Sequence, residues 1–450
     1  DTGAGDAGST TDGGPDPIDP TRCDCDREIL PGEATVELSE LSPGSTVCLR
    51  ADTAAERGPL TLVGLAGTTD RPIVVRNCDG AVRLVSPDVR SALRVPAGSH
   101  FRISGAGAVG VSHGLRLSAP SSAHALLLLR VHHYEIEHLE VDASDYAAIM
   151  AKVDPDRSAC AVGDRRSDPF VMEGVHIHDN HLHDVPGEGL YLGSSFYGGT
   201  TVYCGETQYP HVVRDVRVER NLIERTGWDG LQVGGAIADC VIADNVVRDF
   251  GRAAVGGQNH GIQVGAGSSC EVARNLIDGG PVGMQIAGLG GTVVHHNVVA
   301  ATTGQGLYVN PRPSPLPSDV VDRGYLGPFV LAANTFVAPR LGGAVIADIN
   351  VPGNPVPGGN RLLNNLVVSG GPGFLQLTDR YGWDAQGNLR FDDEIAAGLI
   401  GTAGVDLCLA PDSPAVDAGV DLASLGLGPD FEGRARPRGG GWDVGALECH

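Results

Sequence analysis

A short phrase recurs between residues 175 and 310 and constrains the fold more than any other feature of the chain. Its first half reads Val-x-Val/Ile-x-x-Asn-x-Val/Ile, and its second half reads Gly-Leu/Ile/Met-Tyr/Gln-Val/Leu/Ile. A unit of about two dozen residues is the period of a solenoid whose turns bury apolar side chains only against neighbouring turns. The recurring asparagines are Asn180, Asn221, Asn245, Asn275 and Asn297, with looser continuations at Asn334, Asn365 and Asn388.

Each apolar triplet in the phrase alternates with the two-residue period of a strand that has one buried face. The triplets are too short for helices, and no long helical pattern occurs elsewhere. The asparagines suit a turn that stacks coil on coil, where each amide bonds backbone groups and the copy above it. The repeat therefore predicts an all-β solenoid with one column of asparagine turns.

Composition agrees with such a solenoid and narrows the choice of partner. The 450 residues include 65 glycines and only 5% aromatic residues, which fits tight turns and thin aliphatic layers. The formal net charge of −23 argues against nucleic acid or an anionic membrane as partner. A polyanionic substrate would need calcium to bridge the charges. No apolar run is long enough to span a membrane.

The ten cysteines are an even number and point to an oxidising compartment. Cys240 and Cys270 occupy equal phases of successive coils, so they should lie about 4.8 Å apart and form a disulfide. The other expected bonds join Cys160 to Cys204 in two insertions, Cys408 to Cys449, and two pairs among Cys23, Cys25, Cys48 and Cys78. Zinc binding is the alternative, but only the lone Cys23-x-Cys25 resembles a zinc motif.

Three segments are expected along the chain. Residues 1–22 contain almost nothing apolar and should form a flexible tether; such a tether resembles the segment that follows the lipidated cysteine of bacterial surface lipoproteins, which would place a lipid anchor upstream of residue 1. Residues 23–395 should form the solenoid, and residues 396–450 an end segment packed on it. Insertions are expected at 151–170, 193–212, 251–259 and 310–328, crowded around the glycine-led strand.

Two stretches carry a family resemblance. The opening, Leu41-Ser42-Pro43-Gly44-Ser45-Thr46-Val47-Cys48-Leu49-Arg50, and the close, from Pro411-Asp412-Ser413-Pro414 to Asp443-Val444-Gly445-Ala446-Leu447-Glu448, resemble secreted bacterial proteins of the pectate-lyase-like superfamily. The resemblance implies a single-stranded right-handed parallel β-helix and a secreted or cell-surface location. It leaves the reaction open, because this superfamily includes lyases, hydrolases, epimerases and non-catalytic binders.

Residues of equal phase fall into columns when the coils stack. In the glycine-led strand the apolar residues should point inward and their neighbours outward. An outer face of Gln, Tyr and Gly is suited to binding sugars in a shallow groove, although a purely stabilising Gln ladder is an equal alternative. The outward residues are Tyr191, Gln232, Gln263, Gln285 and Tyr308.

The residue before each glycine lies at the turn that leads into this groove. Glu188, Asp229 and His260 occupy that phase on three successive coils, and such a set can perform acid–base chemistry on a glycosidic bond. The phrases around Trp228-Asp229 and Asn259-His260-Gly261 are similar to motifs of the polygalacturonase family, which implies Asp229 as acid and His260 in support. Glu188 and Trp228 stand where that family has aspartates, and no Arg-x-Lys follows one coil later.

Basic residues offer a second chemistry. Lys152 is the only lysine of the chain and should point out of the same groove, one coil before Glu188. By resemblance to β-helix lyases, Lys152, Arg225 or Arg248 could abstract a proton beside a uronate, with calcium neutralising the carboxylate; a plain surface role is the alternative. The run His176-x-His178-x-x-His181-x-His183 resembles a metal cluster, but strand alternation should spread it over two faces and a turn.

Three functional hypotheses follow. The first is a secreted, polysaccharide-cleaving enzyme, either hydrolase or lyase, with Glu188, Asp229, His260 and Lys152 in catalysis. Its substrate-binding residues would be Tyr191, Trp228, Gln232, Gln263, Gln285, Tyr308, Arg225 and Arg248. The second hypothesis is a non-catalytic glycan-binding or adhesive surface protein. The third is a structural surface scaffold.

Overall fold

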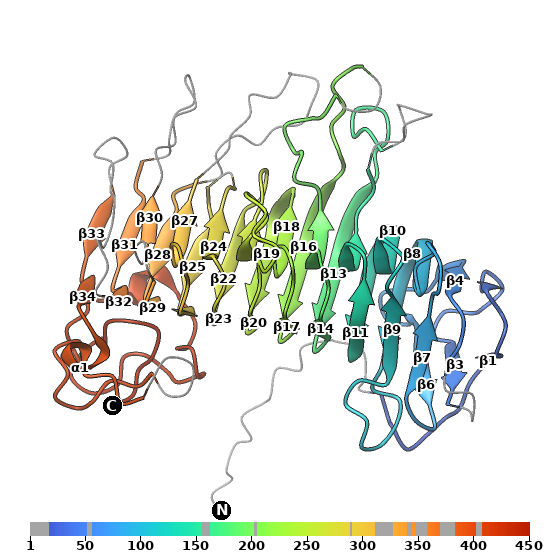
Figure 1. The fold of residues 1–450 in the computed structure, drawn as a ribbon, viewed down its shortest axis with the longest axis horizontal. Helices are drawn as coiled ribbons and strands as arrows, with labels where there is room; N and C mark the ends of the chain where they lie inside the picture. The colour runs from blue at the N-terminus through green and yellow to red at the C-terminus, as the bar shows by residue number, and fades with distance from the viewer. Residues whose placement is uncertain are drawn as a thin grey trace, which may run out of the picture.

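The chain forms a parallel β-helix, as the repeat predicts (Figure 1). The structure is a computed structural model that describes residues 18–51, 56–154, 163–201, 205–288, 290–310, 327–339, 344–346, 358–369, 383–401 and 407–450. Each full coil contributes one strand to each of three sheets, and every pairing between named strands is parallel between neighbouring coils. We number the sheets by their order within one coil, beginning with the strand that precedes the recurring asparagine.

The first sheet precedes the asparagine turn. It consists of β1 (Arg27–Ile29), β3 (Thr46–Arg50), β6 (Ile73–Cys78), β8 (Leu93–Ser104), β10 (His124–Glu137), β13 (Val171–His178), β16 (Val212–Glu219), β19 (Ala236–Ala243), β22 (Cys270–Ala273), β25 (Val293–His295), β28 (Val330–Ala332), β31 (Arg361–Leu363) and β33 (Asp384–Gln386).

The second sheet follows the asparagine turn. It consists of β7 (Val82–Val85), β9 (Leu115–Ala119), β11 (Leu139–Ser144), β14 (His181–His183), β17 (Leu222–Glu224), β20 (Val246–Arg248), β23 (Leu276–Asp278), β26 (Val298–Ala300), β29 (Thr335–Val337), β32 (Leu366–Val368) and β34 (Leu389–Phe391).

The third sheet contains the glycine-led strands. It consists of β2 (Thr35–Glu37), β4 (Leu60–Val63), β12 (Ala147–Ala151), β15 (Glu188–Gly193), β18 (Leu231–Gly234), β21 (His260–Val264), β24 (Val282–Ile286), β27 (Leu307–Val309) and β30 (Ala344–Ile346). The long strands β8 and β10 continue from this sheet into the first, and the short β5 (Leu65–Ala66) pairs with β8 between them.

The asparagine column is confirmed and is longer than its five clear repeats. All eight asparagines, from Asn180 to Asn388, stack one per coil. Asn275 shows the pattern: its Oδ1 accepts the backbone N–H of Asn245 at 3.0 Å, and its Nδ2 donates to the carbonyl of Ile242 at 2.9 Å and to Asn297 Oδ1 at 2.9 Å. Each amide from Asn180 to Asn365 therefore bonds both neighbouring coils at a buried turn.

The glycines of the repeat are required by close approach between coils. A Cβ on Gly189 would lie 2.5 Å from the carbonyl oxygen of Gly230, and a Cβ on Gly230 would lie 2.7 Å from that of Gly261. No side chain fits at such distances. Glycine thus stands at the start of strands β15, β18, β21, β24 and β27, and the residue before it is held at the same corner of each of these coils.

Apolar side chains of all three sheets fill the interior of the solenoid in stacked layers. Leu190, Leu231, Ile262, Met284 and Leu307 point inward as expected and have no exposed surface. The C-terminal segment packs on the outer face of the second sheet, where Ala446 and Leu447 contact Val298 and Val337. This segment includes the one-turn helix α1 (Glu394–Ala397) and the 3-10 turn Ala423–Leu425, neither of which the sequence pattern indicated.

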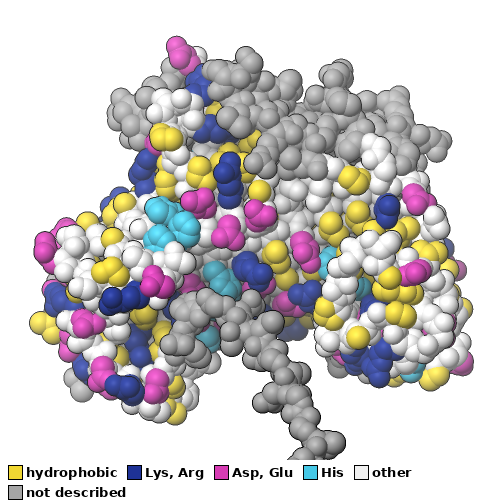
Figure 2. Space-filling view, turned by 180° about the vertical axis from the view of Figure 1, so that it is seen from behind, with side chains coloured by type: hydrophobic (Ala, Val, Ile, Leu, Met, Phe, Trp, Pro, Cys, Tyr) yellow, Lys and Arg dark blue, Asp and Glu magenta, His cyan; other side chains and the backbone are white. Residues whose placement is uncertain are grey.

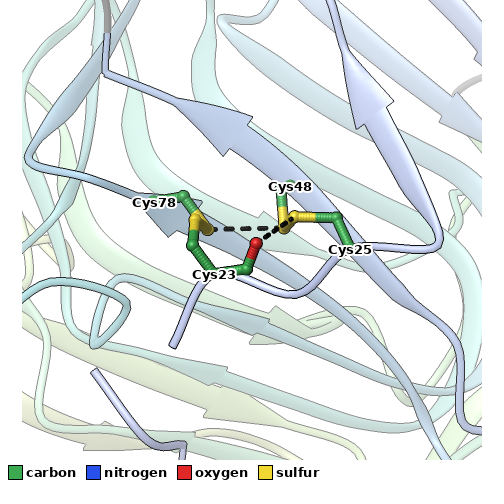
Figure 3. Close-up of side chains that lie close together, drawn as sticks. All are labelled: Cys23, Cys25, Cys48 and Cys78. Atoms are coloured by element: carbon green, nitrogen blue, oxygen red, sulfur yellow. Dashed lines mark hydrogen bonds between the residues drawn. A yellow bond between two sulfur atoms is a disulfide. The ribbon is translucent and has the colours of Figure 1, made fainter. Parts of the chain in front are cut away.

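Disulfides close both ends of the solenoid and join two coils near its middle. Cys240 bonds Cys270 and Cys408 bonds Cys449, which confirms both pairings. At the N-terminal end Cys23 bonds Cys78 and Cys25 bonds Cys48, so these four sulfurs are not thiolate ligands for zinc (Figure 3). Cys160 and Cys204 lie outside the described residues, as does most of the expected insertion at 310–328.

We predict that Asn275→Ala lowers the free energy of unfolding by about 3 kcal/mol, because several buried backbone groups lose partners worth about 1–3 kcal/mol each. Chemical denaturation measures the change. Asn388→Ala is the matched control, since this half-buried asparagine ends the column and water can replace part of its bonding. Equal losses at both positions would contradict a cooperative buried ladder.

Candidate functional site

Glu188, Asp229 and His260 lie on three successive coils at one corner of the third sheet. Gly189 N–H donates to the Asp229 carbonyl at 3.1 Å, and Gly230 N–H donates to the His260 carbonyl at 2.9 Å, which keeps the three residues in register. Glu188 and Asp229 have no exposed surface, and His260 is 4% exposed. The structure therefore brings the three titratable groups together. They are buried, whereas the phase of the repeat indicated an exposed turn.

Asp229 and His260 form a hydrogen-bonded pair. Asp229 Oδ1 accepts both the backbone N–H of His260, at 2.8 Å, and its ring Nδ1, at 3.0 Å. Asp229 Oδ2 is buried without a hydrogen-bond partner. A carboxylate that accepts from Nδ1–H fixes the orientation and tautomer of the imidazole and leaves Nε2 able to take up a proton. The pair has the arrangement of a general base.

Glu188 is suited to the opposite role. Burial and then the neighbouring Asp229 carboxylate raise its pKa well above the ordinary value of 4.5, although Lys152 and the Tyr146 hydroxyl act in the other direction. Its Oε1 accepts from the Tyr146 hydroxyl at 3.4 Å, and its Oε2 is buried without a partner. A carboxyl group that keeps its proton can act as a general acid.

Tyr146 is a residue of this site that the repeat analysis did not single out. Its ring packs edge-on against Trp228, with ring centroids 5.2 Å apart, and against Tyr191, at 6.5 Å. The equivalent position on the coil between them is Gly187, where a Cβ would lie 1.9 Å from the carbonyl oxygen of Tyr146. The sequence signal for this residue was its phase. Tyr146, Gly187 and Trp228 share one column, one residue before the column that contains Glu188 and Asp229.

Lys152 lies over the Tyr191 ring, with Nζ 4.3 Å from the ring centroid, and pairs with Asp154 at 3.1 Å. Burial opposes the charged form, but Tyr191, Asp154 and Glu188 together raise the pKa of Lys152 above its ordinary value. Lys152 is therefore protonated at neutral pH. A charged ammonium can hold an anionic group, but it cannot abstract a proton.

The expected groove residues stack in register, but they are not an open floor. Tyr191 pairs with Gln232, Gln232 with Gln263, Gln263 with Gln285, and Gln285 with Tyr308 on successive strands. The first four are at most 8% exposed, whereas Tyr308 is partly exposed. The cover includes the loop after β15, where the Ser195 hydroxyl bonds Tyr191 Oη at 2.9 Å and also Gln232 Nε2. The expectation of a shallow, open groove was wrong for these coils.

A cavity of about 430 Å³ lies beside the site, on the outer face of the N-terminal coils of the same sheet. Thr61 and Arg94 line it from adjacent coils, and Leu127 is in register with Arg94 on one side and Met150 on the other. His124 lines the same cavity and packs edge-on against Tyr146 at 6.0 Å. His124 therefore lies between this cavity and Tyr146, which contacts Glu188.

Arg225 and Arg248 lie elsewhere on the coil. Arg225 binds Asp184 through two hydrogen bonds of 2.8 Å and also contacts Glu224, on the turn before β18. Arg248 is exposed at the end of β20, on the second sheet. The structure does not bring either arginine into hydrogen-bonding contact with Glu188, Asp229 or His260 among the residues described.

No family model matches the chain, and no curated protein matches it. Among solved structures it is similar to the pectate lyase Pel9A, with 13% identity and a TM-score of 0.46 over 91% of this chain and 89% of that chain. It is also similar to an alginate lyase from Paenibacillus sp. str. FPU-7, with 12% identity and a TM-score of 0.42 over 79% and 99% of the two chains. At such identities the similarity concerns the fold alone.

We predict that Glu188 makes the folded protein less stable as pH rises above about 4.5. The raised pKa means that the folded chain holds this proton where the unfolded chain has lost it, so folding takes up a proton and the free energy of unfolding falls with rising pH. Glu188→Gln should remove this contribution and flatten the decline in urea titrations across pH.

The control is Asp278→Asn, an acid-to-amide change at a half-buried position on the second sheet. It should leave the decline with pH as in the wild type. A Glu188→Gln protein whose stability falls with pH as steeply as that of the wild type would show that Glu188 ionises normally.

Proposed function

We propose that this protein is a secreted carbohydrate-active enzyme that cleaves a polysaccharide by acid–base catalysis at Glu188, Asp229 and His260. The observation that carries the proposal is the pairing of a proton-retaining carboxyl with a carboxylate–imidazole pair one coil away. Glu188 can supply the proton that the leaving sugar needs, and the Asp229–His260 pair can accept a proton from water, as glycosidic cleavage requires.

The roles follow from the contacts. Glu188 donates its proton to the glycosidic oxygen as the bond to the leaving sugar breaks. The water that attacks the sugar carbon gives a proton to the Asp229–His260 pair, at His260 Nε2. One proton is donated and one is taken up, so the reaction balances as a hydrolysis. Lysine-based elimination is less well supported, because Lys152 is charged and sits on the Tyr191 ring. Its ammonium instead binds an acidic or hydroxyl-rich sugar beside the reacting bond.

Substrate would enter from the adjacent cavity. Arg94 lines this cavity together with Arg90, which pairs with Asp88 at 2.8 Å, although the chain as a whole carries a formal charge of −23. Such a local cationic lining favours a sugar chain that bears carboxylates. Glu188 and Asp229 have no exposed surface, so the groups that cover them must move for a sugar to reach them, as lids do in many enzymes.

Secretion is inferred from the cysteines. The described residues contain four disulfides, and such bonds persist in oxidising compartments outside the cytosol. No helix in the described part of the chain has the length and apolar character needed to cross a membrane.

A non-catalytic glycan-binding protein is the second candidate. The complete burial of Glu188 and Asp229 favours it, because a binder needs the cavity but not access to the two carboxyl groups. The two functions separate in a screen of neutral and acidic polysaccharides that measures binding, new reducing ends and the ultraviolet absorbance of unsaturated products. New reducing ends without unsaturation indicate hydrolysis, both signals together indicate elimination, and binding alone indicates the second candidate.

We predict that Glu188→Gln and Asp229→Asn each lower kcat by about 10²–10⁴-fold on the polysaccharide that the screen identifies, because each removes one of the two proton transfers. The steady-state rate of new reducing ends measures the loss. Asp278→Asn serves again as the control and should keep wild-type turnover.

Binding separates this loss from misfolding. Both variants should retain polysaccharide affinity within a few-fold, because the cavity that precedes Tyr146 is unchanged. Full activity in a protein with both substitutions would place the chemistry elsewhere.

A further inference from the structure

Histidine and carboxylate side chains also gather away from the candidate active site, on the outer face of the first sheet. Figure 2 shows the face that is turned away from the viewer in Figure 1. Histidine side chains are grouped there with acidic and basic side chains. His176 and His178 are two residues apart on β13, so both point to the same side of the sheet. Glu135 on β10 is the register partner of His176.

The donor atoms of these three side chains lie close together. The imidazole rings of His176 and His178 have centroids 3.9 Å apart, and His178 Nε2 lies 2.9 Å from Glu135 Oε1. One donor atom from each of Glu135, His176 and His178 lies within 4.8 Å of the other two. An ion with bonds of about 2.1 Å holds tetrahedral donors about 3.4 Å apart, so small side-chain movements complete the set.

The surroundings orient these donors. His178 Nδ1 lies 2.6 Å from Asp179 Oδ2, and Arg220 holds Asp179 at 2.9 Å. The other ring nitrogen of a metal-bound histidine is commonly held by a carboxylate in this way. His176 Nε2 is buried and makes no hydrogen bond; the nearest carboxylate oxygen is Glu219 Oε2 at 3.3 Å.

The site has room for an ion and a further ligand. A cavity of about 210 Å³ is lined by Glu135 and His176 together with His100 and Arg102. The Arg102 guanidinium donates to Glu137 at 2.8 Å and lies farther from Glu135, at 3.4 Å. Glu137 therefore compensates much of the positive charge nearest to the three donors.

We propose that Glu135, His176 and His178 bind a transition-metal dication of the zinc type. Two imidazole nitrogens and one carboxylate oxygen are the donors that such ions prefer, whereas calcium and magnesium take oxygen ligands. The ion links the coil of β10 to the coil of β13 and keeps one coordination position toward the cavity. The proposal is independent of the proposed polysaccharide cleavage, which takes place on another sheet.

The histidine run divides as its spacing indicated. His181 and His183 lie on β14 in the second sheet, where His181 pairs with Glu224 and His183 with Asp184. The sequence could not show the third donor, because Glu135 lies 41 residues before its register partner His176.

The test uses the full-length protein, stripped with a chelator and titrated with ZnCl₂ by calorimetry and thermal unfolding. We expect one zinc equivalent, a rise in Tm with zinc, and no comparable effect of CaCl₂. Cobalt(II) should give the visible absorption of a four-coordinate nitrogen–oxygen site. Failure to bind zinc or cobalt would overturn the proposal without affecting the proposed catalysis.

Variants locate the ion. His176→Gln, at a side chain that is 34% exposed, should fold and lose at least tenfold in zinc affinity. Asp179→Asn should lose about 10–100-fold, because it loosens His178. His181→Gln is the matched control, a partly exposed histidine on β14 that should keep wild-type affinity. Unchanged affinity in both His176→Gln and Glu135→Gln, or an equal loss in His181→Gln, would show that the ion does not bind at these residues.

Discussion

The hydrogen bonding between coils is the constraint on which the rest of this structure depends. At the asparagine turn, each side chain replaces the backbone bonds that a tight corner would otherwise leave unmade, and it does so for the coil before and the coil after. The eight stacked amides therefore fix the relative phase of the coils from Asn180 to Asn388. Because the phase is fixed, residues hundreds of atoms apart along the chain become neighbours whenever they share a position in the repeat, and sites arise as columns.

Stacking in columns brings titratable side chains of successive coils close together. Glu188 and Asp229 occupy one corner of adjacent coils, and neither reaches water. Two buried like charges at one strand spacing are not tolerated, so one group must keep its proton or find a counter-charge. His260, on the third coil, bonds Asp229 and leaves Glu188 as the group that retains a proton. The asymmetry between acid and base follows from the order of three residues in one column.

The repeat was sufficient to predict which residues share a column in the coils that carry the asparagine phrase. It predicted the asparagine column, the Cys240–Cys270 bond and the alignment of Glu188 with Asp229 and His260. It could not predict what covers a column, because cover comes from loops that do not repeat; Ser195 buries Tyr191 and Gln232 through bonds that no periodicity encodes. Nor could it predict the edge-on contact of the Tyr146 ring with Trp228, because side-chain orientation does not follow from the repeat.

The repeat also could not predict that Glu135 lies beside His176. The strand β10 runs for 14 residues through two sheets and lacks the asparagine phrase, so its phase relative to β13 cannot be read from the repeat. On the outer face of the first sheet, the charged pairs are partly exposed to solvent. On the outer face of the third sheet, Glu188 is fully buried. Partial exposure allows an ion to exchange at the first sheet, and burial allows a carboxyl group to keep its proton at the third. One solenoid thus provides two chemically different sites, because Glu188 is fully buried on one sheet and His176 is partly exposed on another.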